Sequence, residues 1–216
     1  MTDTRQKLID GAIATLRDKG IAGTSARAIA AAAGVNQALV FYHFGSVDEL
    51  VDAACREGAA DRVALYREQF DKVTSLRELL ALGRSLNETE RAAGNVAVLA
   101  QVLAGAQQEP KLAAAASHAL ALWVEEIEVT LVRLLAGSPI AEVVDPPGLA
   151  RGIAASFIGI ELYEGVDPAG ADRALVALET LGVLVEVVED LGPVARRALR
   201  ARLRRTAKAG KPPTGQ

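Results

Sequence analysis

Apolar residues recur at helical spacing along almost the whole chain, between short breaks that contain glycine or proline. In the first such segment, Leu8, Ile9, Ala12, Ile13 and Leu16 fall on one face of a helix. Alanine and leucine supply 42 and 27 of the 216 residues, and both favour helices. The β-branched and aromatic residues form no alternating runs, which argues against a β-sandwich. We therefore expect an all-α protein.

The breaks between the apolar segments predict where each helix begins and ends. Gly20, Gly34 and Gly45 follow the first three segments, and glycine commonly ends a helix. Several later segments begin at a proline, which suits the first turn of a helix. The predicted helices are 4–19, 26–33, 37–44, 47–72, 75–90, 94–108, 110–136, 147–164, 168–190 and 193–207.

Charged residues are distributed unevenly along the chain. The net charge of −3 and the pI of about 5.5 would by themselves argue against a nucleic-acid partner. Residues 48–193, however, carry 11 basic and 24 acidic side chains, whereas residues 194–216 carry eight basic and no acidic ones. Residues 1–47 carry five basic and three acidic side chains, so an acidic body lies between two basic ends. For residues 194–216, both a nucleic-acid contact and a merely solvated helix fit.

The chain has few of the side chains that enzyme active sites and metal sites need. Cys55 is the only cysteine, so a disulfide framework and a multi-cysteine metal site are excluded. The two histidines, His43 and His118, lie far apart in the sequence, and no glycine-rich phosphate loop is present. We therefore expect no enzyme, no metal site and no other cofactor.

The sequence also bears on where the protein works. Residues 1–10 lack the apolar core of a secretory signal, and no uncharged stretch is apolar enough to span a membrane. We therefore expect a cytoplasmic protein with no membrane partner.

Residues 26–44 have the spacing of a helix-turn-helix, with two short helices joined by a turn at Gly34. Val35 and Val40 can fill the small core between these helices. The second helix would place its first turn in the major groove, where Gln37 can pair with a base edge, preferably adenine. A generic helical hairpin with the same glycine turn is the alternative interpretation.

This segment resembles the DNA-binding signature of the TetR family of one-component repressors. The similarity runs through TSARAIAAAAGVNQALVFYHF at 24–44 and continues through GSVDEL at 45–50. Leu8, Ala12 and Gly20 also match the family's first helix and turn. The resemblance implies an N-terminal three-helix helix-turn-helix domain at 1–47 and a C-terminal helical effector-binding and dimerisation domain at 48–207. Residues 208–216 would form a disordered tail.

The resemblance also implies which residues meet DNA. They are Thr24, Ser25, Arg27, Asn36, Gln37, Ala38, Leu39, Tyr42 and His43. Of these, His43 suits a phosphate contact and a role at the helix end equally well, while Phe41 and Phe44 are expected in the core. The family usually places a lysine where this chain has Val47, so one phosphate-neutralising cation is missing.

Apolar residues of the later helices are candidates for an effector pocket and a dimer interface. The pocket candidates are Leu99, Val102, Leu103, Trp123, Ile127 and Phe157, although a packed core would use the same residue types. Two apolar helices, 147–164 and 168–190, can pair with their two-fold mates as a four-helix bundle. The interface candidates are Leu149, Ile153, Phe157, Ile160, Leu178, Leu181, Val185 and Val188, with burial inside one protomer as the alternative.

These features together predict a sequence-specific DNA-binding transcriptional regulator. It would be a repressor that an apolar small-molecule effector releases from its operator, as the family resemblance implies. A homodimer would match a pseudo-palindromic operator, because both have two-fold symmetry. A helical adaptor that binds another protein is the alternative, and the helix-turn-helix spacing argues against it.

Overall fold

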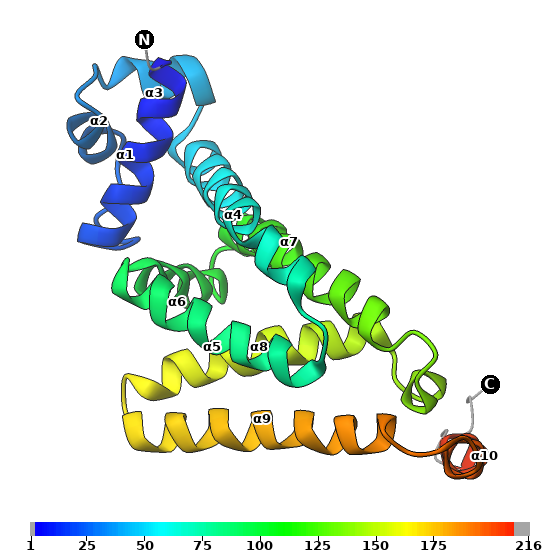
Figure 1. Ribbon diagram of the computed structural model, residues 1–216. Helices are drawn as coiled ribbons and strands as arrows, with labels where there is room; N and C mark the ends of the chain where they lie inside the picture. Colours follow the sequence, from blue (N-terminus) through cyan, green and yellow to red (C-terminus); the bar gives the residue numbers. More distant parts are fainter. Residues whose placement is uncertain (1–2, 210–216) are drawn as a thin grey trace. The chain divides into compact units, whose positions relative to one another are not determined.

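The computed structural model describes residues 3–209, which form ten α-helices and one short 3₁₀-helix, with no strand (Figure 1). The all-α prediction is thus confirmed. No helix in this part of the chain is long and apolar enough to cross a membrane. The elements are α1 (Thr4–Lys19), α2 (Ala26–Ala33), α3 (Ala38–Phe44), α4 (Val47–Lys72), α5 (Leu76–Ala92), α6 (Asn95–Ala106), α7 (Pro110–Leu134), η1 (Pro139–Glu142), α8 (Pro146–Glu164), α9 (Pro168–Glu189) and α10 (Pro193–Ala209).

The helix ends follow from capping side chains that the sequence places there. The Ser25 hydroxyl oxygen accepts a hydrogen bond from the backbone N–H of Ala28 (3.2 Å), and Gly34 ends α2 with a left-handed φ of 66°. Just before α3, the Asn36 side-chain oxygen accepts from the N–H of Ala38 (2.8 Å), and α3 starts at Ala38, one residue later than predicted. The short η1 was not predicted, because four residues give too little apolar periodicity.

The chain divides into two compact units, each of which is described separately. The first contains the residues up to Arg67 together with Leu86–Trp123. The second contains Glu68–Ser85 and the residues from Val124 onward.

The first unit has a small, fully closed core where α1, α2, α3 and α4 meet. Its buried members are Leu8, Ile9, Ala12, Ala26, Ile29, Ala30, Val40, Leu50 and Ala54. Burying one Leu or Ile side chain stabilises a fold by about 1.5–3 kcal/mol. Close packing of α1 on α2 depends on Gly11, where a Cβ would lie 2.9 Å from the Ile29 carbonyl oxygen.

A second cluster in the same unit joins the connection after α1 to α6 and α7. Val102, Leu112 and Ala116 are buried here, and the side chain of Ile21 packs against them. Ile21 needs the space left at Gly105, where a Cβ would lie 2.9 Å from the Ile21 Cδ1. We call α1, α2 and α3, with the connections between them, the head. The head therefore shares apolar packing with α6 and the start of α7.

The second unit contains the antiparallel pair α8 and α9 (Figure 1). Asp145 and Asp167 cap these helices by accepting hydrogen bonds from the N–H groups of Gly148 (3.0 Å) and Gly170 (2.9 Å). Between the helices, Ile160, Ala171 and Leu175 are buried, with Phe157 and Leu178 packed against them. The pair thus has an inner apolar face of its own.

Candidate nucleic-acid interface

The start of α3 presents side chains to solvent, away from the buried cluster between α1, α2, α3 and α4, which we call the head core. Asn36, Gln37 and Ala38 are exposed, and Tyr42 is 81% exposed. Val40 lies on the opposite side of the helix and is fully buried. The sequence expectation that this first turn is available to a partner therefore agrees with the exposure of its side chains.

Phe41 does not lie in the core, and the prediction that placed it there is wrong. Its side chain is 50% exposed, whereas Phe44 packs against the head core. Phe41 follows Gln37 by four residues and therefore shares its face of the helix. An exposed ring at this place can contact the methyl group of thymine. The spacing from Gln37 was the sequence signal that pointed to this role.

Leu39 and His43 are less accessible than their neighbours. Leu39 is half-buried and packs against the head core. His43 is also half-buried, and its ring lies edge-on to Tyr42 with 5.0 Å between the ring centroids. The more accessible side chains here are thus those of Gln37, Ala38, Phe41 and Tyr42.

The start of α2 places two hydroxyls and one guanidinium close together in the sequence. Ser25 is exposed, and because its oxygen only accepts from Ala28, its own hydrogen can be donated to a phosphate. The hydroxyl of Thr24 instead donates to the Gly20 carbonyl oxygen (2.8 Å). Arg27 is exposed and is the only Lys or Arg in α2 and α3.

One further cation of the head is engaged with an acidic side chain. Arg5 forms an ion pair with Glu57 (2.6 Å), and its hydrogen bond to Glu57 raises the pKa of its guanidinium. This pair reduces the positive charge that the head can offer to a polyanion. At the start of α4, Lys111 of α7 pairs with Asp48 (2.9 Å) and offsets that acidic charge.

The six candidate pocket residues do not form one described cavity. In the first unit, Val102 is buried in the α6–α7 cluster, with Leu103 packed against it and Leu99 half-buried on the same helix. The ring of Trp123 lies 6.1 Å from that of Tyr66, between centroids. In the second unit, Ile127 is buried and Phe157 packs between α8 and α9.

Next to Trp123, the first unit holds a polar cluster that the sequence did not reveal. The carboxylate of Glu90 accepts hydrogen bonds from Arg62, from the Tyr66 hydroxyl and from the Asn95 amide (2.6 Å). Burial raises the pKa of Glu90, but these hydrogen bonds outweigh it and hold the pKa below its usual range. The members come from α4, α5 and α6, and no short motif signals such an arrangement.

The candidate dimer residues divide into an inner and an outer set. Ile153 and Ile160 are buried inside the protomer, and Phe157 packs against the cluster that contains Ile160. These three side chains are therefore not available to a second copy of the chain. Leu181 is 56% exposed. Leu149, Leu178, Val185 and Val188 are half-buried.

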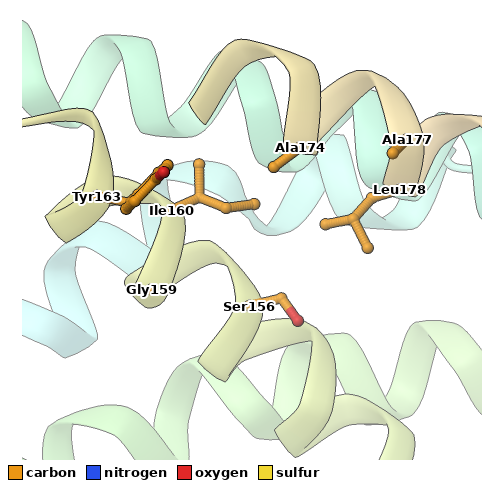
Figure 2. A pocket seen from close by; sticks show the side chains of 7 residues that line it. All are labelled: Ser156, Gly159, Ile160, Tyr163, Ala174, Ala177 and Leu178. Carbon is orange, nitrogen blue, oxygen red and sulfur yellow. The ribbon is translucent and has the colours of Figure 1, made fainter. Parts of the chain in front are cut away.

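An open groove of about 470 Å³ runs along α8 and α9 (Figure 2). It is lined by Ser156, Gly159, Ile160, Tyr163, Ala174, Ala177 and Leu178. Figure 2 shows these side chains coming from the two adjacent helices, with Gly159 leaving the backbone of α8 uncovered.

Two further features bear on catalysis and metal binding: the Cys55 thiol and the placement of the possible metal ligands. Burial, with the nearby charge of Asp52, raises the pKa of the Cys55 thiol to about 11, so this thiol stays protonated at neutral pH. Within residues 3–209, no group of three His, Cys, Asp or Glu side chains is placed to hold a metal ion.

The exposed face of α3 and its supporting core lie in the segment that matches a known family. The model of the family described as bacterial regulatory proteins, tetR family, matches residues 8–54, from α1 into the first turns of α4. Residues 8–54 thus match the DNA-binding region of TetR-family regulators. An N-terminal helix-turn-helix followed by a C-terminal helical domain is also the fold of the solved regulators described next.

Several solved structures share the fold over most of this chain. One, described as a TetR-family transcriptional regulator from Rhodococcus sp., is 25% identical with a TM-score of 0.70, covering 86% of this chain and 99% of that one. The multidrug binding protein EbrR complexed with proflavin is 29% identical with a TM-score of 0.59, covering 83% and 99%. The regulator FadR from Bacillus subtilis in complex with stearoyl-CoA is 18% identical with a TM-score of 0.65, covering 85% and 96%, and supports the fold alone. No curated protein matches the sequence.

The polar cluster around Glu90 leads to a pH-dependent stability. We expect Glu90→Gln to lower the free energy of unfolding by about 2 kcal/mol at pH 7, because hydrogen bonds to a charged acceptor are lost. Since the folded-state pKa of Glu90 is lowered, this contribution is complete above the unfolded pKa and is lost as the pH falls through the folded one. Urea unfolding followed by circular dichroism should show a constant difference between pH 7 and about 5 that shrinks below about pH 4.

The exposed Glu88 provides the matched control. Glu88→Gln should change the unfolding free energy by less than about 0.5 kcal/mol, as surface substitutions usually do. A difference between Glu90→Gln and the unchanged protein that widens on acidification would contradict the assignment.

Proposed function

We propose that this chain is a TetR-family regulator, a cytoplasmic repressor that binds a pseudo-palindromic operator as a homodimer and is released by an apolar small molecule. The observation that carries the proposal is the outward face of α3, where Gln37, Ala38 and Phe41 stand over a closed apolar core. A rigid core fixes the direction of these side chains, as specific base contacts require.

The proposed contacts divide into those that read bases and those that position the head. Gln37 would pair with a base edge, and Ala38 and Phe41 would contact thymine methyl groups. Ser25, Arg27 and Tyr42 would contact phosphates and fix the register without reading sequence. Asn36, which is exposed, and His43, which is half-buried, would add contacts beside these. Direct contacts are less favoured for Thr24, whose hydroxyl donates to Gly20, and for Leu39, which packs against the head core.

A gel shift with the DNA upstream of the chain's own gene tests the reading surface. We expect Gln37→Ala to weaken operator binding by about 1–3 kcal/mol per half-site and to relax discrimination at one base pair. Arg27→Ala should weaken binding to operator and random duplex by the same factor, because a phosphate contact is not specific.

Gln69 is an exposed glutamine of α4 outside the head and provides the control. Gln69→Ala should bind the operator as the unchanged protein does. If Gln37→Ala bound equally tightly and with the same base preference, the proposed reading role of α3 would be wrong.

The outer faces of α8 and α9 support the homodimer. Large apolar side chains there are about half exposed, although water-facing helices normally carry polar ones. They are Leu162, Tyr163, Val176, Leu181, Leu184 and Val187. An apolar surface of this extent marks an interaction site, and a second copy of the same helix pair would cover it as a four-helix bundle. At Gly159, a Cβ would meet no atom within 4 Å, so another backbone can approach closely.

Light scattering after size-exclusion chromatography tests the interface. We expect a mass of two chains for the unchanged protein and of one chain, 22.6 kDa, for the double variant Leu181→Glu plus Leu184→Glu, because buried charges would be unpaired. Leu65 in α4 is 59% exposed, close to the 58% of Leu184, and Leu65→Glu should leave the mass unchanged. A double variant that still had the mass of two chains would place the interface elsewhere.

We propose that the effector contacts Trp123 together with Leu99, Val102 and Leu103, which lie in the same unit. The proflavin complex of EbrR supports binding of an aromatic small molecule by this fold. Ile127 and Phe157 stay sequence predictions for the same role. The effector would release DNA by binding better to a state whose two heads no longer match the half-sites.

Trp123 is the only tryptophan, so its emission reports on one place in the chain. In a titration of the DNA-free protein with proflavin, we expect the Trp123 emission to change as the dye binds. DNA is left out because proflavin itself binds between base pairs, and Trp123→Phe removes the signal and provides the blank. Binding of proflavin in equilibrium dialysis with no change in emission would show that the effector does not contact Trp123.

A further inference from the structure

The last helix, α10, has a composition unlike any other helix of the chain. Over Pro193–Ala209 it contains six arginines and one lysine but no acidic residue. Its side chains fall into two sets of different exposure. The less exposed set is Arg196, Leu199, Arg200 and Leu203, and the exposed arginines are Arg197, Arg202, Arg204 and Arg205.

The two sets occupy opposite faces of one helix. At 100° per residue, the less exposed set falls within one arc, and the exposed arginines fall on the other side together with Val194, Ala198 and Ala201. The inner face is held in place, since α10 packs against η1 and Arg200 donates a hydrogen bond to the Gly137 carbonyl oxygen (3.3 Å). The outer face is therefore a fixed basic surface.

We propose that the outward face of α10 is a second DNA contact, which binds the phosphate backbone of a duplex without reading its sequence. Guanidinium groups suit phosphates because they donate two parallel hydrogen bonds. From Arg197 to Arg205 the four exposed groups extend over about 12 Å of helix, at 1.5 Å per residue, and can meet several phosphates. This inference rests on the proposed function only in taking the chain to be a DNA-binding protein.

The head offers few cations to phosphates, so contacts from α10 would add substantially to duplex affinity. Duplex affinity depends strongly on the number of phosphates that cations neutralise. In the head, Arg27 is the only Lys or Arg of α2 and α3, Arg5 is paired with Glu57, and Val47 stands at the start of α4. The eight positive charges of residues 194–216 thus exceed the head's contribution.

The make-up of the outward face favours a duplex over a lipid surface. A helix that lies in a membrane interface inserts large apolar side chains such as Trp, Phe or Leu. On α10 the two leucines, Leu199 and Leu203, belong to the less exposed set, and the outward face offers Val194 and alanines. The outward face can therefore attract phosphates electrostatically, but it lacks the large apolar side chains that would insert into a lipid surface.

Fluorescence anisotropy with a random-sequence 40-base-pair duplex tests the proposal on the full chain, between 50 and 200 mM NaCl. In the first variant, glutamine replaces Arg197, Arg202, Arg204 and Arg205. The control variant makes the same change of net charge outside α10, with glutamine at the exposed Lys72, Arg77, Arg151 and Arg173. We expect the first variant to lose up to about 3.6 units of the log–log salt slope per chain and to bind at least ~10-fold more weakly at 100 mM salt. The control should keep its slope within about one unit.

Equal slopes for the unchanged protein and the α10 variant would overturn the proposal. It would also be overturned if the variant kept its DNA slope but lost binding to phosphatidylglycerol vesicles, or lost a higher oligomeric mass, because the face would then serve a membrane or another copy. Replacement of the same four arginines by lysine keeps the charge and must keep the slope, even if the glutamine variant folds poorly.

The outcome is separable from the test of the reading surface. Gln37→Ala should change the ratio of operator to random-duplex affinity and leave the salt slope intact. The α10 variant should lower the salt slope and leave the ratio of operator to random-duplex affinity intact. A Gln37→Ala variant without effect would therefore contradict the reading role of α3 and leave the α10 result to stand by itself.

Discussion

The exclusion of water from between Ile29, Val40 and Leu50 is the interaction on which the DNA-reading head depends. These three side chains are fully buried and come from α2, α3 and α4. Since α3 has only seven residues, it is too short to be stable by its own hydrogen bonds. Its direction, and thus the direction of Gln37, is set by the burial of Val40. The exposed face proposed to read DNA is thus oriented by apolar packing on the opposite side of the same helix.

Much of this architecture could be predicted from the sequence because local signals agreed with the packing. Glycine breaks, capping Ser and Asn side chains and apolar periodicity all pointed to the same helix ends, and the observed bounds of α1 are those predicted. The exposed face of α3 could also be inferred, except at Phe41, which is 50% exposed. An aromatic residue on a short helix is ordinarily buried, and its spacing of four residues from Gln37 was not taken into account.

What could not be predicted depends on contacts between distant segments. The cluster around Glu90 takes side chains from three helices, and no pattern within one segment signals it. In the same way, periodicity found the apolar stripes of α8 and α9 but could not separate the inner residues, such as Ile160, from the outer ones, such as Leu184. Both faces of these helices are apolar, so the pattern has no polar side to orient it.

The insertion of Ile21 beside Gly105 has a consequence for how the protein can be taken apart. Cutting the chain after the head would leave Ile21 without the α6 and α7 side chains that cover it, namely Val102, Leu112 and Ala116. The excised fragment would expose an apolar patch to water and lose part of its own stabilisation. The head should therefore unfold together with α6 and the start of α7, whose side chains cover Ile21.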